Sequence, residues 1–408
     1  MLCSINNIDI PIPYSNKRAT IILDGKSLII TGNNGSGKTS FIKDIYNHLS
    51  NILKNKSEND LNHLKNQKLH FEELLKRTSK DNTSYKAYAQ RANEYNTKIK
   101  HLSDININTS ENDVTDTRSL LRFHAATRQS SIASPTQAPK HSILVEQNKD
   151  FDNEKDGSNF FESYLLSLKK NQSYAIAFDE DLDEANRINA WFNKIQNDLR
   201  LLFEDSALEL IFNSKDEKFY LIQKNKEPYT FQALSSGYSS ILSIYTDLIM
   251  RVEMWNVTPE NIEGIIFIDE IDAHLHVSLQ KQILRFFMNS FPKVQFIVTT
   301  HSPFVVTSVT NAVIYDLTTN EQITDISSYS YGIVMEELFG VKTESHALLE
   351  KLNSIETLLK DITPNNIKKL DDEISSLAAA QGNMSEEVQA FLDHAKLEIL
   401  KMKKQIQG

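Results

Sequence analysis

Residues 28–40 read Leu28-Ile29-Ile30-Thr31-Gly32-Asn33-Asn34-Gly35-Ser36-Gly37-Lys38-Thr39-Ser40, and this run constrains the rest of the chain more than any other. An apolar run typical of a strand leads into a glycine-rich turn, and a helix is expected to leave the turn and continue to Leu49. The turn has the G-x-x-x-x-G-K-T spacing of a P-loop, in which backbone N–H groups and a helix N-terminus bind phosphate oxygens. The sequence therefore predicts a site for the phosphates of a nucleotide.

The side chains of this turn have expected tasks. Lys38 is expected to reach the β- and γ-phosphates, and the Thr39 hydroxyl is expected to coordinate Mg²⁺. The residues expected to bind the nucleotide are Asn33, Asn34, Gly35, Ser36, Gly37, Lys38, Thr39 and Ser40.

Composition excludes several classes of protein. The chain has 408 residues and a single cysteine, Cys3, which rules out a disulfide framework and fits a reducing compartment. No apolar run of about 18 residues is present, so no membrane-spanning helix is expected. We expect a soluble, cytoplasmic protein.

Charge is distributed unevenly along the chain. The net charge is -10, yet residues 51–100 carry 11 Lys/Arg against 6 Asp/Glu. A basic segment on an acidic body can contact nucleic acid, but it is more often the solvated face of exposed helices. Both interpretations stay open at this stage.

The apolar pattern predicts three parts: an α/β head (1–48 and 115–340), an inserted helical hairpin with a loop (49–114), and a helical tail (341–408). In the head, short apolar strands alternate with helices, as expected for a parallel sheet. We expect loops at 103–116 and 130–142, and one helix over 277–289. The expected strands after the P-loop are 120–124, 208–212, 219–223, 264–268, 294–298 and 312–315. The expected tail helices are 346–360, 364–379 and 385–404.

Two acids follow the apolar strand 264–268. Asp269 stands where a carboxylate at the end of a strand beside the P-loop strand can hold Mg²⁺, together with Thr39. Glu270 is expected to act as the general base that polarises the attacking water. With the P-loop, this pair predicts hydrolysis of ATP or GTP.

Further motifs follow in a recognisable order. Leu234-Ser235-Ser236-Gly237-Tyr238 opens a helix before the two acids, and Thr299-Thr300-His301-Ser302-Pro303 follows the next strand. This order resembles that of ABC-type ATPase heads of the SMC/RecF/OLD-like branch. The resemblance implies an ABC-type fold with a mixed or parallel sheet, ATP and Mg²⁺ as cofactors, and ATP sites between two protomers.

The same resemblance assigns further residues. Ser235 and Gly237 would contact the γ-phosphate of ATP on the opposite protomer, although Ser236 and Tyr238 depart from the usual L-S-G-G-Q. Asp272 would be the D-loop acid, and His301 would sense the γ-phosphate as a catalytic residue. Gln129 is the nearest candidate for the Q-loop glutamine that contacts the metal.

The match narrows to bacterial anti-phage defence ATPases. The run 270–276, Glu-Ile-Asp-Ala-His-Leu-His, and the box around His301 resemble PtuA of Septu and retron systems, AriA of PARIS and the ATPase half of OLD nucleases. No Toprim pattern is visible in 341–408. The resemblance thus implies a sensor or regulator ATPase that acts as a homodimer or higher oligomer and controls a separate effector, a nuclease or toxin.

Three alternatives are carried forward. A DNA-repair or chromosome-binding ATPase would use the basic hairpin on nucleic acid. A transporter subunit would need a membrane partner, and the helical tail disfavours it. A self-contained nuclease would need an acidic or histidine cluster outside the ATP site, which the sequence does not show.

Overall fold

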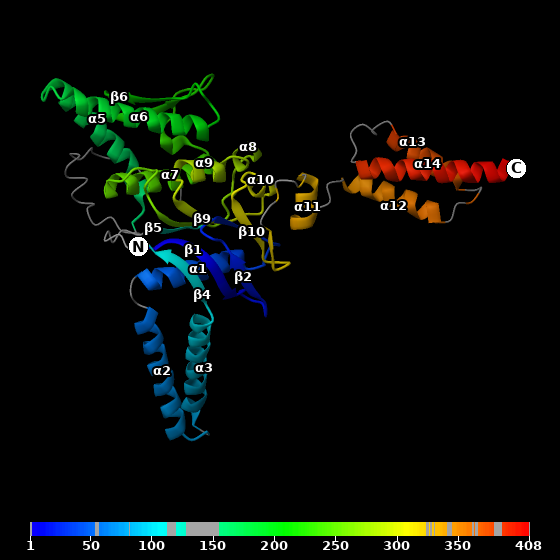
Figure 1. The fold of residues 1–408 in the computed structure, drawn as a ribbon, viewed down its shortest axis with the longest axis horizontal. Helices are drawn as coiled ribbons and strands as arrows, with labels where there is room; N and C mark the ends of the chain where they lie inside the picture. Colours follow the sequence, from blue (N-terminus) through cyan, green and yellow to red (C-terminus); the bar gives the residue numbers. More distant parts are fainter. Residues whose placement is uncertain are drawn as a thin grey trace. The chain divides into compact units, whose positions relative to one another are not determined.

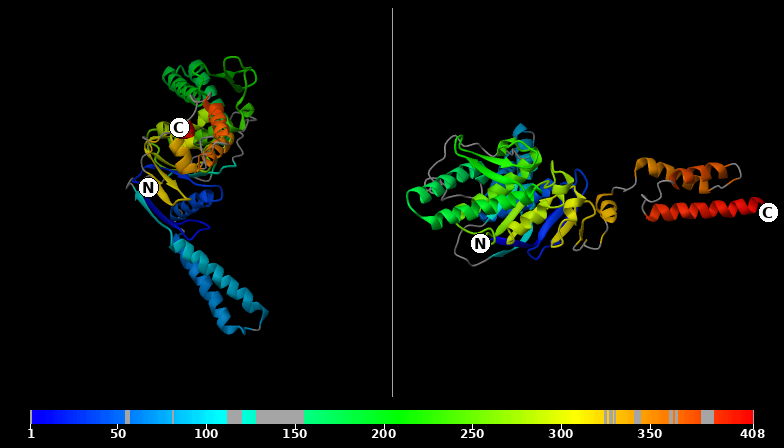
Figure 2. Two further views of the ribbon diagram at one scale, coloured as in Figure 1. Left: turned by 90° about the vertical axis from the view of Figure 1, so that its right-hand side faces the viewer. Right: turned by 90° about the horizontal axis from the view of Figure 1, so that it is seen from above.

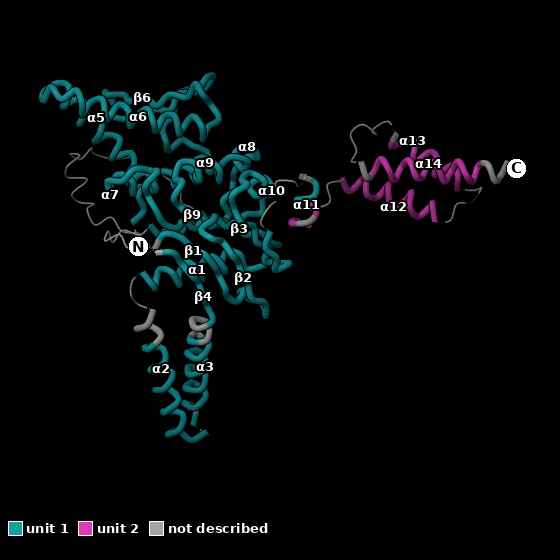
Figure 3. The backbone as a smooth tube through the Cα atoms, in the orientation of Figure 1, with its two compact units in different colours: residues 1–334 teal, residues 335–408 magenta. Residues whose placement is uncertain are grey.

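The computed structural model describes residues 2–53, 57–80, 82–111, 120–127, 155–323, 326, 329, 331–340, 345–360, 363, 366–378 and 386–407. The chain forms two compact units, Met1–Val334 and Met335–Gly408 (Figure 3). Gln129 and the loop expected at 130–142 lie outside the described residues. Among the described residues, no helix is long and apolar enough to cross a membrane.

A six-stranded sheet forms the centre of the first unit (Figure 1). Its strands are β3 (Ser27–Thr31), β5 (Leu120–His124), β8 (Gly264–Ile268), β9 (Val294–Thr299), β10 (Ala312–Asp316) and β11 (Glu321–Ile323). The order is β11-β10-β3-β9-β8-β5, with β11 antiparallel to β10 and all other pairs parallel. β3, β8, β9 and β10 are buried throughout, which explains their unbroken apolar runs. The predicted α/β class with a mixed, mostly parallel sheet is confirmed.

A second sheet covers part of this one. It has the order β2-β1-β4 and is antiparallel, with β1 (Leu2–Pro11), β2 (Arg18–Ile22) and β4 (Asn106–Glu111). The loop predicted at 103–116 is therefore wrong over β4, where a polar sequence forms a strand because β1 offers a ladder that pairs Ile8 with Ile107. Residues 106–111 thus belong to the sheets of the head, although the sequence placed them in the insertion 49–114.

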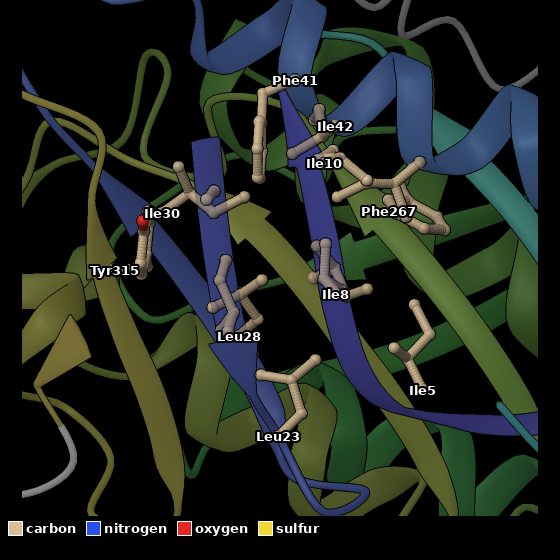
Figure 4. Close-up of a cluster of buried hydrophobic side chains, with 14 of the residues drawn as sticks. Ile5, Ile8, Ile10, Leu23, Leu28, Ile30, Phe41, Ile42, Phe267 and Tyr315 are labelled. Carbon is tan, nitrogen blue, oxygen red and sulfur yellow. The ribbon is translucent and has the colours of Figure 1, made fainter. Parts of the chain in front are cut away.

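The main apolar core fills the space between these sheets and the helix that leaves the P-loop. That helix is α1 (Lys38–Leu53), and its buried side chains include Phe41 and Ile42. Figure 4 shows them packed with side chains from β1, β3, β8 and β10, and all are nearly inaccessible to solvent. The labelled members are Ile5, Ile8, Ile10, Leu23, Leu28, Ile30, Phe41, Ile42, Phe267 and Tyr315.

A helical hairpin follows α1, where the sequence predicts one. Its arms are α2 (Ser57–Arg77) and α3 (Thr83–Ser103), each of 21 residues and therefore about 30 Å long. Phe71 of α2 stacks on Tyr95 of α3 with ring centroids 5.7 Å apart, which holds the two arms together.

A lobe of helices and a small hairpin, drawn in green in Figures 1 and 2, is inserted in the sequence between β5 and β8, which are neighbours in the sheet. It contains η1 (Gly157–Phe160), α5 (Phe161–Ala177), α6 (Leu182–Leu202), β6 (Glu209–Asn213), β7 (Lys218–Ile222) and η2 (Phe231–Ala233). The long helix α7 (Ser236–Trp255) follows and is buried along most of its length. It ends at Asn256, which takes the left-handed conformation that closes many helices.

Short helices connect the last strands. The single helix predicted over 277–289 is wrong, because the structure divides it into α8 (Val277–Gln280) and α9 (Ile283–Ser290). Gln280 ends the first helix by donating to the carbonyl of Leu275, 2.8 Å away, and by accepting from Ser302 Oγ at 2.6 Å. Helix α10 (Pro303–Val306) begins at Ser302, whose Oγ accepts from the N–H of Phe304.

The second unit is a small helical bundle. Its helices are α12 (His346–Lys360), α13 (Ile367–Ala378) and α14 (Glu386–Gln407), close to the ranges predicted from the sequence. α11 (Tyr331–Phe339) spans the division between the units. The buried core of the bundle consists of Ile355, Leu370, Ile374, Leu377, Val388, Leu392, Ala395 and Ile399.

Candidate active site

The glycine-rich turn lies between β3 and α1 at the carboxyl end of the sheet. Its conformation requires glycine, because Gly32 and Gly37 have φ angles of 135° and 90°. A Cβ atom on Gly32 would also fall 2.9 Å from Ser36 Oγ, closer than real Cβ contacts allow. Asn33 N donates to Thr318 Oγ1 at 2.9 Å, so the turn that follows β10 holds the loop in place.

The lysine of the motif lies along the inside of this loop. Lys38 is buried, and its Nζ donates to the carbonyls of Gly32 (2.8 Å) and Asn33 (3.1 Å). Burial lowers the pKa of the Lys38 ammonium, and nearby carboxylates oppose that shift. Those carboxylates belong to Glu270, Asp316, Asp269 and Asp272. One cation thus lies among the three predicted acids and Asp316, which sequence reasoning did not single out.

The first of the two acids is held rigidly. Asp269 is 2% exposed, and its N–H donates to the carbonyl of His124 at the end of β5 (2.9 Å). Its Oδ1 accepts from Thr39 Oγ1 at 3.1 Å and from Thr299 Oγ1 at 2.7 Å. The structure therefore brings together the two residues predicted to bind Mg²⁺, and a hydroxyl with a carboxylate suits a hard cation.

The second acid adopts an uncommon backbone conformation. Glu270 has a φ of 47°, in the left-handed region that non-glycine residues rarely occupy. Its N–H donates to Thr299 Oγ1 at 2.7 Å, so one hydroxyl fixes both acids. Such strained positions gather at functional sites, which fits the role predicted for Glu270. The side chain remains partly exposed and accessible to a reactant.

The predicted γ-phosphate sensor and D-loop acid share this neighbourhood. Thr300 Oγ1 donates to Asp272 Oδ1 at 2.6 Å and accepts from the N–H of Ser302 at 2.9 Å, which fixes the chain on both sides of His301. Burial lowers the pKa of the His301 imidazole, and the Lys38 ammonium lowers it further. Three acids oppose these effects: Asp272, Glu270 and Asp269. His301 is thus near enough to the P-loop lysine to sense its charge.

The remaining P-loop residues form an open rim. Asn33, Asn34 and Gly35 are exposed, and Ser40 is half-buried. Ser36 Oγ is buried and has no hydrogen-bond partner among the residues that the structure describes. A buried hydroxyl of this kind needs an acceptor or donor, and a phosphate oxygen at the loop would provide one. The residues present therefore fit a nucleotide phosphate.

The predicted signature turn contacts other parts of the same chain. Ser235 is exposed at the start of α7, and its side chain makes no capping hydrogen bond. A Cβ atom on Gly237 would lie 2.5 Å from the carbonyl oxygen of His274, so glycine is needed for this close approach. Tyr238 stacks on Phe203, with ring centroids 4.4 Å apart and planes at 3°. The signature turn is thus packed against the segment that follows Glu270 rather than against the P-loop.

Sequence reasoning missed a buried charge cluster beside the site. Asp247 of α7 is inaccessible to solvent and accepts from Arg122 Nε (3.0 Å), Arg251 Nη2 (3.2 Å) and Gly157 N (2.6 Å). Burial alone would raise the pKa of this carboxyl, but Arg251, Arg122 and His124 lower it to about 2. The cluster joins α7 to β5, whose last residue contacts Asp269. Positions 122 and 247 are too far apart in sequence for any local pattern to link them.

Thr299 is the second residue whose role was missed. It belongs to the box quoted around His301, but only the structure shows its hydroxyl between the two acids. A signal was present, since a hydroxyl at the carboxyl end of a buried strand lies next to the end of the neighbouring strand in a parallel sheet.

Comparison with known proteins fits this geometry. A family model described as "AAA domain, putative AbiEii toxin, Type IV TA system" matches residues 27–307. "Septu protein PtuA" of Bacillus mycoides (strain KBAB4) is 30% identical over 202 residues, covering 46% of this chain and 28% of that protein. "Retron Ec83 probable ATPase" of Escherichia coli is 41% identical over 88 residues, covering 21% of this chain and 16% of that protein. These relatives confirm the resemblance to PtuA and to retron ATPases.

A solved structure of an Smc head bound to the C-winged helix domain of ScpA aligns over 80% of this chain and 98% of that chain, with 14% identity and a TM-score of 0.38. The alignments with the two sequence relatives cover 28% of PtuA and 16% of the Ec83 ATPase, so this chain spans well under half the length of either protein.

Proposed function

Because the chain belongs to the AAA-domain family whose model matches residues 27–307, we propose that it hydrolyses ATP at a site completed by a second protomer. The observation that carries this proposal is the convergence of Lys38, Thr39, Asp269 and Glu270 at one end of the sheet, with Thr39 Oγ1 3.1 Å from Asp269 Oδ1. These four residues come from opposite halves of the sequence and meet beside the P-loop. That arrangement suits phosphoryl transfer to water.

The side chains divide the chemistry among them. Lys38 and the loop N–H groups would bind the phosphates, while Thr39 and Asp269 would hold Mg²⁺. Bound Mg²⁺ supplies positive charge that offsets the charge on the phosphates. Glu270 would accept a proton from the attacking water, and its partial exposure leaves room for that water. His301, with its lowered pKa, would be neutral at pH 7 and able to donate or accept one hydrogen bond.

A cavity of about 570 Å³ beside the start of α1 supports binding of a whole nucleotide. Ser40, next to the phosphate loop, is one of its lining residues. The cavity is large enough for a nucleoside. Its lining residues are Pro11, Ile12, Pro13, Tyr14, Ser40, Lys43, Asp44, Asn47, Thr97 and Asp104.

The second protomer would contribute Ser235 and Gly237. Ser235 is exposed with an uncommitted hydroxyl, as a residue that contacts ATP on another chain should be. Asp272 would lie at the same interface. The packing of Gly237 on His274 would then connect the two ATP sites, because His274 follows Asp269 and Glu270 of its own site.

The biological role we propose is a cytoplasmic regulator in an anti-phage system, in which the ATP state holds or releases a separate nuclease or toxin. The names of the PtuA and retron relatives support this role. A DNA-repair role through the basic hairpin is the alternative, and strong salt-dependent stimulation of ATP turnover by DNA would favour it.

Two variants test the site. Lys38→Ala should abolish ATP binding, and unchanged affinity would remove the P-loop assignment. Glu270→Gln should bind ATP, stop turnover and accumulate an ATP-dependent dimer, whereas near-normal hydrolysis would place the base elsewhere. Glu217→Gln is the matched control, since Glu217 has a similar φ of 53° but lies in the exposed β6–β7 turn.

The role is tested by tagging the Glu270→Gln chain at its native locus and identifying the proteins and nucleic acids that co-purify with it. A stoichiometric nuclease or toxin subunit would support the regulator. DNA without a protein partner would support the repair-type alternative.

A further inference from the structure

The turn between α5 and α6 exposes an unusual amount of apolar surface. Tyr174, Ile176, Phe178 and Leu182 are 53%, 54%, 77% and 64% exposed, within nine consecutive residues. The rings of Tyr174 and Phe178 lie 5.9 Å apart, so the exposed surface is continuous at this point. A contiguous apolar patch on a soluble surface marks an interaction site more often than chance. We call residues 174–184 the α5–α6 knob.

The knob is also strongly acidic. Asp179, Glu180 and Asp183 are exposed, while Asp181 caps α6 by accepting from Glu184 N at 3.0 Å. A basic group beside it, Arg187, is already paired with Glu184 at 2.6 Å. A partner for this surface must therefore offer an apolar recess with basic groups at its edge.

Such a recess lies beside the same helix, α6. A cavity of about 640 Å³ opens between α6 and the α8–α9 segment. Its apolar lining includes Leu202, Leu279 and Ile283, and Leu201 stands 63% exposed among the lining residues. The charged lining groups are Lys194, Lys281 and Arg285 against Asp198 and Glu260.

These charges are not equally available to a partner. Lys194 pairs with Asp198 at 2.8 Å, and Arg285 donates to the carbonyl of Ser308. Lys281 lines the cavity and is exposed, with its Nζ 5.2 Å from the centre of the Phe304 ring. Lys281 is thus the cation best placed to meet an incoming carboxylate.

The knob and the cavity are connected by one straight element. Leu182 and Leu201 are 19 residues apart on α6, which corresponds to about 28 Å. Between them an exposed stripe of small or amide side chains runs along the helix: Asn186, Ala190, Asn193 and Asn197. Two α6 helices packed antiparallel through this stripe would place Leu182 of each beside Leu201 of the other. A two-fold axis near residues 191 and 192 would generate both contacts at once.

From this arrangement we propose that the α5–α6 knob is the docking surface for a second copy of this chain, whose α6 cavity receives it reciprocally. The occupant is a second copy because the apolar, acidic knob matches a cavity with an apolar lining and an exposed lysine, and because knob and cavity lie at the two ends of one helix. This interface needs no nucleotide and goes beyond the proposed ATP-dependent contact. Two different self-contacts in one chain would build an oligomer larger than a dimer.

Sedimentation velocity without nucleotide, in a Lys38→Ala background, tests the proposal apart from the ATP site. The chain with an unaltered lobe should associate, and Phe178→Ala should weaken association by about tenfold or more, because a buried aromatic anchor is lost. Lys215→Glu, in the exposed β6–β7 turn, is the matched control and should leave association unchanged. Monomers at all concentrations up to about 100 µM, far above the dissociation constants of specific contacts, would overturn the proposal.

Charge reversal identifies the partner surface. Asp179→Lys/Glu180→Lys and Lys281→Glu should each weaken self-association, since like charges then meet in both reciprocal contacts. A 1:1 mixture of the two variants should recover association, because each knob then meets a cavity of opposite charge. A different result would be that the knob variant loses self-association, that Lys281→Glu alone does not, and that mixing the two variants fails to restore it. That result would mean that the knob binds another surface, and it would refute this interface. The ATP-dependent dimer of the Glu270→Gln chain should persist in all these variants.

Discussion

Replacing Asp247 by Asn tests the energetic importance of the buried charge cluster. The substitution keeps the shape of the side chain and removes the only described carboxylate that accepts from both Arg122 and Arg251. Two largely buried guanidinium groups would then lack their common counter-charge. We expect the first unit to lose a large part of its stability.

The magnitude follows from the carboxyl's pKa. A shift from 3.8 to about 2 corresponds to about 2.5 kcal/mol of preference for the charged form in the folded state. Removing one partner of a buried ion pair typically destabilises by about 3–5 kcal/mol, because the remaining charge is left uncompensated. We therefore expect a loss of about 3–5 kcal/mol in the free energy of unfolding at pH 7.

Urea unfolding followed by tryptophan fluorescence measures this loss selectively. The chain has two tryptophans, Trp191 and Trp255, and both lie in the first unit. Trp255 is on α7 with the Arg251 guanidinium carbon 6.0 Å from its ring centre, so it reports on the cluster directly. Asp216→Asn, in the exposed β6–β7 turn, is the control and should change stability by less than about 1 kcal/mol.

The pH dependence gives a second check. Because the folded pKa is lowered, the stabilisation by Asp247 is fully present above pH 3.8 and is lost as the pH falls through about 2. The difference between the native chain and Asp247→Asn should therefore be constant from pH 7 to about 5 and shrink below about 4. A loss under about 1 kcal/mol at pH 7 would refute the reasoning, because the cluster would then be solvated rather than buried.

Three further predictions concern the site itself. Gly237→Ala should destabilise by about 1–3 kcal/mol in urea unfolding, because its Cβ would lie 2.5 Å from the His274 carbonyl oxygen; a change near zero, as expected of the neighbouring Ser236→Ala control, would contradict this packing. Thr299→Val should lower the free energy of unfolding by about 1–3 kcal/mol and lower ATP turnover, since it removes the hydroxyl that fixes both acids. The exposed Thr307→Val is the control and should leave turnover unaltered. Unaltered turnover in Thr299→Val would show that Thr299 does not position the acids. The pKa of the His301 imidazole, measured by NMR titration, should lie below its usual 6.5, so protonation of His301 should destabilise the fold as the pH falls below 6.5. Lys38→Ala should raise the pKa of His301, because it removes a nearby positive charge. An unchanged pKa of His301 in Lys38→Ala would show that the two side chains do not interact.

Local sequence determined the elements that carry the phosphate site. Three glycines with their lysine and threonine specify one loop, because backbone sterics and a few neighbouring N–H groups settle its shape. The buried strands were equally readable, since runs such as Ile265-Ile266-Phe267-Ile268 suit a strand covered on both faces. The acids after that strand were readable for the same reason, because the end of the strand fixes the position of the next two residues.

Only the tertiary structure decided which of these pieces meet. Thr39 and Asp269 are 230 positions apart and come within 3.1 Å because the fully buried strands β3, β9 and β8 lie side by side. The arrangement of the sheets also forms the Asp247 cluster, and it places β1 where it pairs with the polar strand β4. It also brings Ser302, 22 residues away in sequence, to the amide of Gln280 at the end of α8. Propensity and periodicity act over a few residues, whereas these contacts depend on which apolar faces exclude water together, and that is a property of the whole fold.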